Sequence, residues 1–324
     1  MAPSVTRAWV RWGGAALGLG VAFTGALLLK LAGLTGPGTA LIVLGLALGG
    51  AWALAGDAGG WAEGWALLRA RARHLARTTP AWASFLAASA LLKVPVPLWP
   101  AGFTLLGTLS TVCLALAATA WAWRAVGRRR ALAATGLAVI AGLGVEVLGS
   151  RTGFPFGTYS YAGAPGVTVL GVPIIVPLGW WALTLAAAHL ARGRAWLAGL
   201  LLVAWDVGLE PLMTAQGYWT WTAHTLRGVT VEGWAQPPVG LWAGAPLQNF
   251  VAWGVIGALL VLALRRVAPG LVPAVGGARG GVAAAYAVEA FFLPGGLLLL
   301  GRPLEAAVTL LVMGVSAWIS WRRA

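Results

Sequence analysis

The sequence predicts an all-α fold, a polytopic bundle of about ten transmembrane helices with the N-terminus and C-terminus in the cytoplasm. Of the 324 residues, 60% are hydrophobic and only 9% are charged, whereas about 25% of the residues of a soluble globular domain are charged. Apolar runs of about 20 residues, long enough to cross a bilayer as helices, recur along the chain. Only helices and closed barrels satisfy the backbone inside lipid. The runs are continuous and do not alternate, so helices are expected and strands are not.

Ten apolar runs fit this pattern, and each is predicted to be one span. They cover residues 14–34, 38–56, 81–98, 101–122, 131–149, 168–191, 195–213, 246–264, 281–301 and 303–321.

The positions of the basic residues supply an independent prediction of orientation. With ten spans and the N-terminus inside, 17 of the 22 Lys and Arg residues fall on the cytoplasmic side, as the positive-inside rule requires. The outer side receives Lys30, Lys93, Arg151, Arg227 and Arg302. The net charge of +14 is thereby explained by arginine-rich cytoplasmic loops, which are also expected to contact anionic lipid headgroups. No basic helix with interleaved aromatics indicates a nucleic-acid partner, and we expect an integral protein of the bacterial inner membrane.

Two regions are predicted. Residues 1–80 hold the first two spans and a basic cytoplasmic segment, 57–80, which is either a helix lying on the membrane surface or a simple linker. Residues 81–324 form the larger bundle. Two long outer loops, 150–167 and 214–245, are rich in aromatic residues, and loops of this length are often functional.

Acidic residues are scarce, which makes the candidate site small. The chain has eight, and Glu232 falls in an outer loop. Glu305 is expected to pair with Arg302, and the role of Glu289 is left open. Acidic residues inside the membrane are costly and are functional candidates by default.

Three acidic residues are predicted to converge near the outer mouth of the bundle. Asp206 and Glu210 are four residues apart and share a helix face, while Glu146 lies at a similar depth on another span. Closely spaced carboxylates in an apolar setting cannot all ionise, so a neutral acid is expected beside an ionised base. That pairing suits general acid–base catalysis. The three histidines are far apart in the sequence, and no metal site is expected.

Several motifs in sequence order resemble one membrane family. They are Glu146-x-x-Gly149, then Thr152-Gly153-Phe154-Pro155-Phe156-Gly157-x-Tyr159-x-Tyr161, Gly171-Val172-Pro173, Pro177-Leu178-x-Trp180, Asp206-x-x-x-Glu210-Pro211, Gly217-Tyr218-Trp219-x-Trp221 and Pro246-Leu247-x-Asn249-Phe250-x-x-Trp253. The run resembles the integral-membrane carotenoid 1',2'-hydratases, closely over residues 140–266 and loosely over 81–324. Family members often have Asp-Pro where this chain has Glu210-Pro211, which leaves open which acid plays which part.

The resemblance implies a hydro-lyase that needs no cofactor. It would add water to the terminal double bond of an acyclic carotenoid such as lycopene or γ-carotene. Asp206 is the expected proton donor, with Glu210 and Glu146 as water activators or charge partners. The expected substrate-binding residues are aromatic side chains and one asparagine that positions water: Phe154, Phe156, Tyr159, Tyr161, Trp180, Trp219, Trp221, Trp253 and Asn249. The expected partners are the carotenoid, water, membrane lipid and other enzymes of the same pathway.

Three rival functions stay open. A carotenoid cyclase or isomerase would use the same protonation without adding water. A proton-coupled transporter would also use intramembrane acids, although no inverted repeat is evident. A non-catalytic membrane subunit would show no activity.

Overall fold

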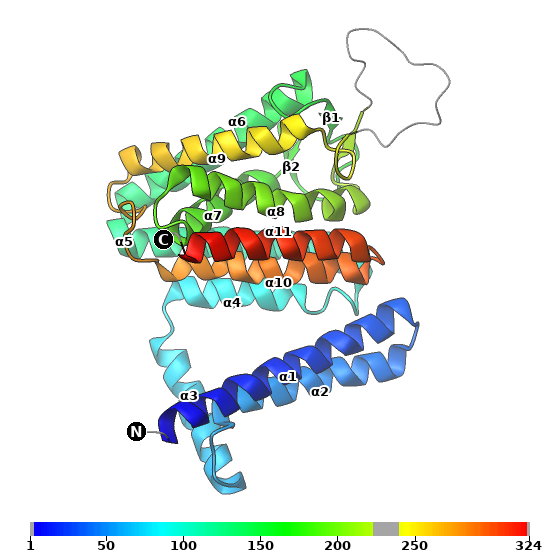
Figure 1. The fold of residues 1–324 in the computed structure, drawn as a ribbon, viewed down its shortest axis with the longest axis vertical. Coiled ribbons are helices and arrows are strands. Elements are labelled where there is room, and N and C mark those ends of the chain that lie inside the picture. Colours follow the sequence, from blue (N-terminus) through cyan, green and yellow to red (C-terminus); the bar gives the residue numbers. More distant parts are fainter. Residues whose placement is uncertain (1–2, 223–239, 323–324) are drawn as a thin grey trace. The chain divides into compact units, whose positions relative to one another are not determined.

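The computed structural model describes residues 3–222 and 240–322, and these form eleven α-helices and four two-residue strands (Figure 1). The predictions for Arg227, Glu232 and Arg323 lie outside the described residues. The helices are α1 (Pro3–Leu31), α2 (Thr35–Ala55), α3 (Trp61–Thr78), α4 (Ala81–Lys93), α5 (Phe103–Val126), α6 (Arg128–Thr152), α7 (Ile175–Leu190), α8 (Ala195–Ala215), α9 (Leu247–Val267), α10 (Ala284–Leu299) and α11 (Pro303–Arg322).

A helix occurs at each of the ten predicted positions, which confirms the all-α class. Within the described residues, eight helices are long and apolar enough to cross a bilayer, and the chain is an integral membrane protein. Two helices are shorter than predicted. Helix α4 ends at Lys93 because Pro95 and Pro97 lack the N–H that a helix needs and disfavour helical backbone before them. Helix α7 begins at Ile175, after a short hairpin that occupies the start of the predicted run.

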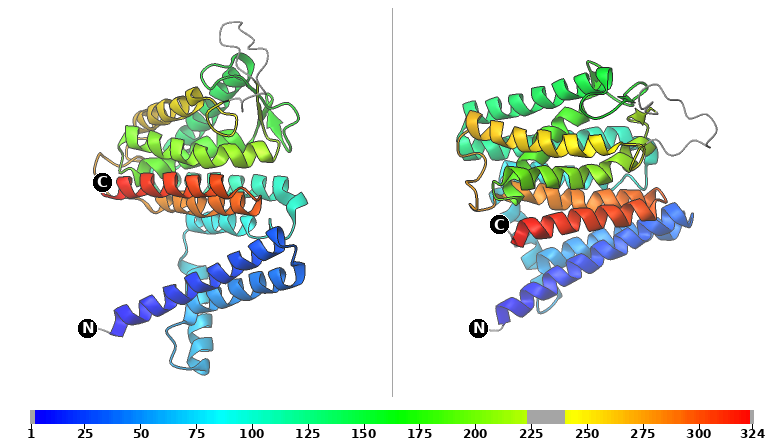
Figure 2. Two further views of the ribbon diagram at one scale, coloured as in Figure 1. Left: turned by 45° about the vertical axis from the view of Figure 1, so that its right-hand side comes forward. Right: turned by 45° about the horizontal axis from the view of Figure 1, so that its top comes forward.

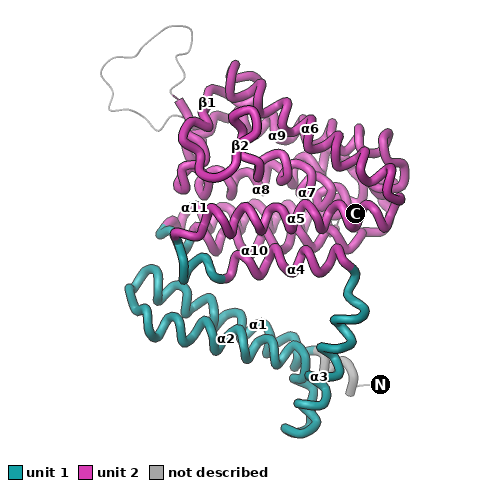
Figure 3. Tube along the Cα trace, turned by 180° about the vertical axis from the view of Figure 1, so that it is seen from behind, with its two compact units in different colours: residues 1–80, 95–100, 298–301 teal, residues 81–94, 101–297, 302–324 magenta. Residues whose placement is uncertain are grey.

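The chain divides into two compact units (Figure 3). Residues 1–80, 95–100 and 298–301 form the smaller unit, in which α1 and α2 pack through glycines. A Cβ at Gly49 would lie 3.2 Å from the carbonyl oxygen of Ala15, so the two backbones approach closely. The amphipathic segment 57–80 contains α3, and Arg71 of α3 donates to Asp57 (Nη2–Oδ2, 2.8 Å). This hydrogen bond lowers the pKa of Asp57 to about 2.

Residues 81–94, 101–297 and 302–324 form the larger unit, and α7 and α8 are its core. Almost every residue of α7 is buried. Helix α8 has close neighbours on two sides, because a Cβ at Gly199 would overlap the carbonyl of Gly254 on α9 and one at Gly208 would overlap Thr309 on α11. These glycines place α8 deep in the bundle, and α8 carries two of the three candidate carboxylates.

The helix connections of the larger unit lie at its two ends (Figure 2). One end holds the α5–α6, α7–α8 and α9–α10 connections and their arginines, including Arg192, which donates to the carbonyl of Gly277 (Nε–O, 2.8 Å). The other end holds the loop 150–167 and the described residues of the loop 214–245. There β1 (Tyr159–Ser160) pairs antiparallel with β4 (Thr220–Trp221), and β2 (Thr168–Val169) pairs with β3 (Val172–Pro173). The expectation of no strands was wrong at these two places. The β1–β4 pair joins two loops that lie outside the apolar runs, whereas the β2–β3 hairpin occupies the start of the predicted run 168–191, where Gly171 has a φ of 88° at the turn.

Candidate active site

The first part of the site is built around Glu146 on α6. Gly142, Glu146 and Gly149 are spaced by four and three residues and therefore lie on one helix face. Both glycines make room for aromatic side chains. A Cβ at Gly142 would lie 2.9 Å from Cβ of Trp180, and one at Gly149 would lie 2.6 Å from the Tyr159 hydroxyl. The face of α6 around Glu146 is therefore shaped to receive aromatic donors.

Three donors converge on the Glu146 carboxylate. Its Oε2 accepts from the hydroxyls of Tyr159 and Tyr161, each at 2.7 Å, and its Oε1 accepts from Nε1 of Trp180 at 3.0 Å. Helix α6 ends at Thr152, and the next residue, Gly153, has a φ of 77° that lets the chain turn back. The loop that follows carries both tyrosines.

The tyrosines keep their protons in this setting. Burial, followed by the negative charge of Glu146, raises the pKa of Tyr159 and of Tyr161 well above the usual value. Both hydroxyls therefore donate to Glu146. A carboxylate that accepts three hydrogen bonds is held in place and is suited to carry negative charge.

The second part of the site is the pair Asp206 and Glu210 on α8. Asn249, near the start of α9, joins them, because its Nδ2 donates to Oδ2 of Asp206 at 2.8 Å and to Oε1 of Glu210 at 3.1 Å. Glu210 Oε2 also accepts from Nε1 of Trp219 and of Trp221, each at 2.9 Å. Glu210, like Glu146, thus accepts three hydrogen bonds.

Asp206 differs from the two glutamates. It is completely buried, and its Oδ1 has no hydrogen-bond partner. Nε1 of the neighbouring Trp205 is also buried without a partner. An unpaired polar atom in an apolar interior is costly, so such an atom calls for an explanation in a functional site. Oδ1 is available either to carry a proton or to receive one.

Aromatic rings fill the space between the two parts. Trp253 of α9 stacks on Trp180, with ring centroids 3.8 Å apart and planes 6° apart. Tyr159 lies 5.1 Å from Trp221, and Tyr161 lies 6.1 Å from Trp219, between ring centroids. Tyr159, which donates to Glu146, thus lies beside Trp221, which donates to Glu210, and Asn249 joins Glu210 to Asp206. The three carboxylates therefore share one environment, enclosed by aromatic side chains.

The remaining predicted substrate-binding residues are Phe156 and Phe154. Phe156 is buried and packs near Tyr159 and Trp253, with ring centroids 6.1 and 6.4 Å away. Phe154 is 67% exposed and lies apart from the enclosed cluster. Gln248 donates from Nε2 to the carbonyl of Pro155 at 2.7 Å, which ties the turn beside Phe154 to α9.

The other intramembrane acids have basic partners. Glu289, whose role the sequence left open, forms an ion pair with Lys93 between α10 and α4. Glu305 pairs with Arg302 at 3.5 Å, as predicted. In the part of the chain that the structure describes, no group of three His, Cys, Asp or Glu side chains is placed to hold a metal ion.

One contact near the site escaped sequence analysis. Pro211 has no N–H, so the carbonyl of Val207 loses its usual donor within α8. Trp242 replaces that donor, with Nε1 at 2.8 Å from the Val207 oxygen. The proline signalled that a carbonyl would be free one residue after Asp206, but nothing in the sequence showed which side chain would bind it.

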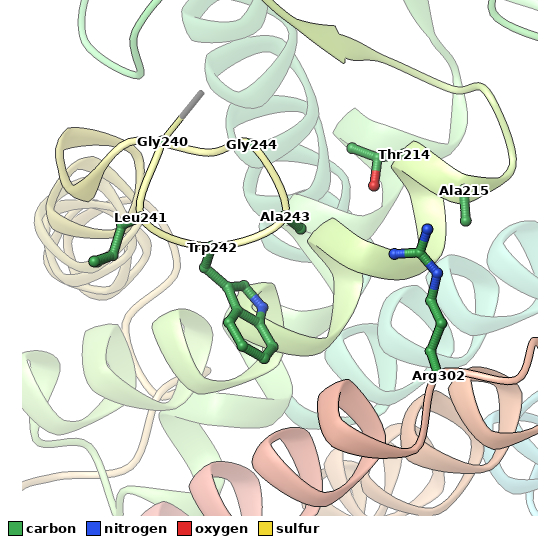
Figure 4. A pocket seen from close by; sticks show the side chains of 8 residues that line it. All are labelled: Thr214, Ala215, Gly240, Leu241, Trp242, Ala243, Gly244 and Arg302. Atoms are coloured by element: carbon green, nitrogen blue, oxygen red, sulfur yellow. The ribbon is translucent and has the colours of Figure 1, made fainter. Parts of the chain in front are cut away.

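Trp242 also lines an open pocket of about 390 Å³ at the loop-bearing end of α8 (Figure 4). Thr214 and Ala215 at the end of α8, the turn formed by residues 240–244, and Arg302 complete its wall. The Arg302 side chain extends toward Thr214 and Ala215.

Comparison with known proteins identifies two similarities. A family described as carotenoid biosynthesis protein matches residues 102–316. A protein named bisanhydrobacterioruberin hydratase, from Haloarcula japonica, is 30% identical over 189 residues, which cover 54% of this chain and 57% of that relative. The match thus spans little more than half the length of the relative. No solved structure matches.

Proposed function

Because this chain belongs to the carotenoid biosynthesis protein family, we propose that it is a carotenoid hydratase. The hydro-lyase reaction adds water across the C1'=C2' double bond of an acyclic end group, with lycopene or γ-carotene as substrate. The name of the Haloarcula japonica relative, a hydratase of a carotenoid, supports this reaction type. The family match covers most of the larger unit, including all three carboxylates.

The physical setting suits such a substrate. A carotenoid is nearly all hydrocarbon and about as long as the hydrocarbon core of a bilayer is thick, roughly 30 Å. A chain with eight membrane-length helices among its described residues and a cluster of carboxylates at one end of its bundle can meet a reactive end group where the bilayer gives way to water.

Asp206 is the proposed proton donor. An alkene carbon accepts a proton but offers no hydrogen bond beforehand, so its donor needs an oxygen that no other group occupies. Asp206 Oδ1 meets this requirement, since it is buried and unpartnered, whereas every oxygen of Glu146 and Glu210 accepts at least one hydrogen bond. Transfer of the proton to C2' breaks the π bond and leaves a tertiary cation at C1'.

The aromatic rings and the remaining carboxylates complete the reaction. A cation over the face of a desolvated indole is stabilised by about 2 kcal/mol. Trp180, which donates to Glu146, and Trp253, which stacks on Trp180, are both buried. Water then attacks C1' and forms the C–O bond. Glu210 or Glu146 accepts the proton that the water loses, and Asn249, which already donates to two carboxylates, orients the water. The product is a tertiary alcohol.

The observation that carries this proposal is the Asn249-bridged pair in which Asp206 keeps one buried oxygen free. It is tested by expressing the chain in a lycopene-producing bacterium and measuring the molecular mass of the extracted carotenoid by mass spectrometry. A carotenoid heavier by one water, whose oxygen carries label when the cells grow in ¹⁸O-water, is expected. Pigment changed in structure but not in mass would instead indicate a cyclase or isomerase, and unchanged pigment would contradict both.

A further inference from the structure

We propose that the pocket lined by Thr214, Ala215, Trp242 and Arg302 is the port through which water reaches the Asp206–Glu210 pair. The inference rests on the proposed hydratase function, because only a hydration consumes water. It assigns a role in that reaction to a surface feature about one helical turn from Glu210 and two turns from Asp206 along α8.

The carboxylates themselves are closed to solvent. Glu146 is 3% exposed, Glu210 is 2% exposed and Asp206 is fully buried. The indoles and hydroxyls that donate to them occupy the loop side of the cluster. A reaction that takes up one water in each turnover needs a path around this aromatic layer, and the layer offers no polar lining along its ring faces.

The pocket lies at the end of such a path. Asp206, Glu210 and Thr214 follow one another at four-residue spacing and therefore share one face of α8. Thr214 borders the pocket, so a single helix face leads from the opening to the buried acid. The hydroxyl of Thr214 donates to the backbone carbonyl of Glu210 at 2.7 Å, which links the pocket wall directly to the residue that activates water in the proposed reaction.

The chemistry of the wall also suits water. A route for water needs polar partners for it, and the wall combines the Arg302 guanidinium, the Thr214 hydroxyl and exposed backbone of the 240–244 turn (Figure 4). A proline inside a helix leaves one carbonyl without its usual N–H donor. Pro211 lies between the pocket and Asp206 on α8. It leaves the carbonyl of Val207 without a donor in the helix, and Trp242 donates to that carbonyl instead.

The opening is held in shape by the turn that carries Trp242. Within this turn Leu241 N donates to the carbonyl of Ala245 at 2.7 Å, and Ala245 N donates back to the carbonyl of Trp242 at 2.8 Å. Gly240 has a φ of 109°, which a residue with a side chain rarely adopts. With its ring bonded to Val207, Trp242 forms a fixed boundary between the pocket and α8.

The test fills the pocket and follows the fate of the cation. Purified protein in lipid vesicles is given lycopene deuterated at C2'. Two products are measured, the alcohol and recovered lycopene that has lost deuterium. Loss of deuterium reports cations that form and return to alkene: the deuteron passes to Asp206 and then exchanges with solvent, a proton transfer that takes up no water molecule. The variant Ala215→Trp places an indole in the pocket mouth, Thr214→Leu narrows it by a smaller change, and Leu200→Trp, at a lipid-exposed position on the same helix, is the control.

We expect Ala215→Trp to lower the ratio of alcohol to deuterium loss by about tenfold, Thr214→Leu to lower it less, and Leu200→Trp to leave it unchanged. Two results would contradict the assignment of the pocket as a water port. One is a fall in both products with an unchanged ratio of alcohol to deuterium loss, and the other is a wild-type ratio in both pocket variants. If the unmodified protein forms neither alcohol nor deuterium-depleted lycopene, the hydratase function fails, and this result is distinct from failure of the port alone.

Discussion

Replacing Gly149 with alanine should separate Tyr159 from Glu146 and slow the proposed hydration. The added Cβ would lie 2.6 Å from the Tyr159 hydroxyl and 2.7 Å from Cδ2 of Phe156. Ordinary contact begins at 3.4 Å, so the hydroxyl must move by about 0.8 Å. Its 2.7 Å hydrogen bond to Glu146 cannot survive such a shift away from α6.

The expected loss follows from the kind of bond. A hydrogen bond to a charged group contributes about 1.5–3 kcal/mol, which corresponds to a fall of about 10- to 150-fold in rate if Glu146 acts in the rate-limiting step. Tyr161 and Trp180 still donate to the carboxylate, so Glu146 remains in the site and some activity should persist.

Gly144→Ala is the matched control, because Gly144 lies on the same helix and has no atom within 4 Å of the added Cβ. Alcohol formation is measured for both variants at equal amounts of membrane-inserted protein. Equal, wild-type rates for Gly149→Ala and Gly144→Ala would refute the idea that the tyrosine–Glu146 contact supports the reaction. A loss of folded protein in Gly149→Ala alone would show that the contact serves stability instead.

Two further predictions concern hydrogen bonds and the structural ion pair. Trp219→Phe and Trp221→Phe each remove one N–H donor to Glu210 and should each slow alcohol formation by about tenfold; rates equal to wild type in both variants would exclude Glu210 from the step. Lys93→Met leaves the buried Glu289 charge without its partner and should destabilise the protein by about 3–5 kcal/mol. The double variant Lys93→Met/Glu289→Leu should regain most of that loss in thermal unfolding in detergent, and a double variant as unstable as the single one would contradict the ion-pair account.

The helices were predictable because their signal is long and continuous. Runs of about 20 apolar residues leave few alternatives in lipid, and the charge asymmetry agreed with the count. The errors fall where local chemistry competes with hydrophobicity. Pro95 ended α4 early, and the stretch from Thr168 to Pro173 turns at Gly171 and forms a hairpin although its residues are apolar enough for a helix.

The acidic residues of the site were predictable because the chain contains so few of them. Their partners were only half predictable. Tyr161, Trp180 and Trp219 were expected as an aromatic wall, whereas the structure directs their hydroxyl or N–H groups at Glu146 and Glu210. Sequence reveals that a residue is aromatic, but the direction of its polar atom depends on loops that meet only after folding, as β1 and β4 do.

The central claim is that Asp206 delivers the proton, and the Asp206→Asn variant tests it most directly. Asparagine has nearly the same shape and still fits beside Asn249, but it has no carboxylic proton to give. With lycopene supplied and the variant present in the membrane at the wild-type amount, the account predicts that extracted lycopene stays unhydrated. Alcohol formed at the wild-type rate would contradict it.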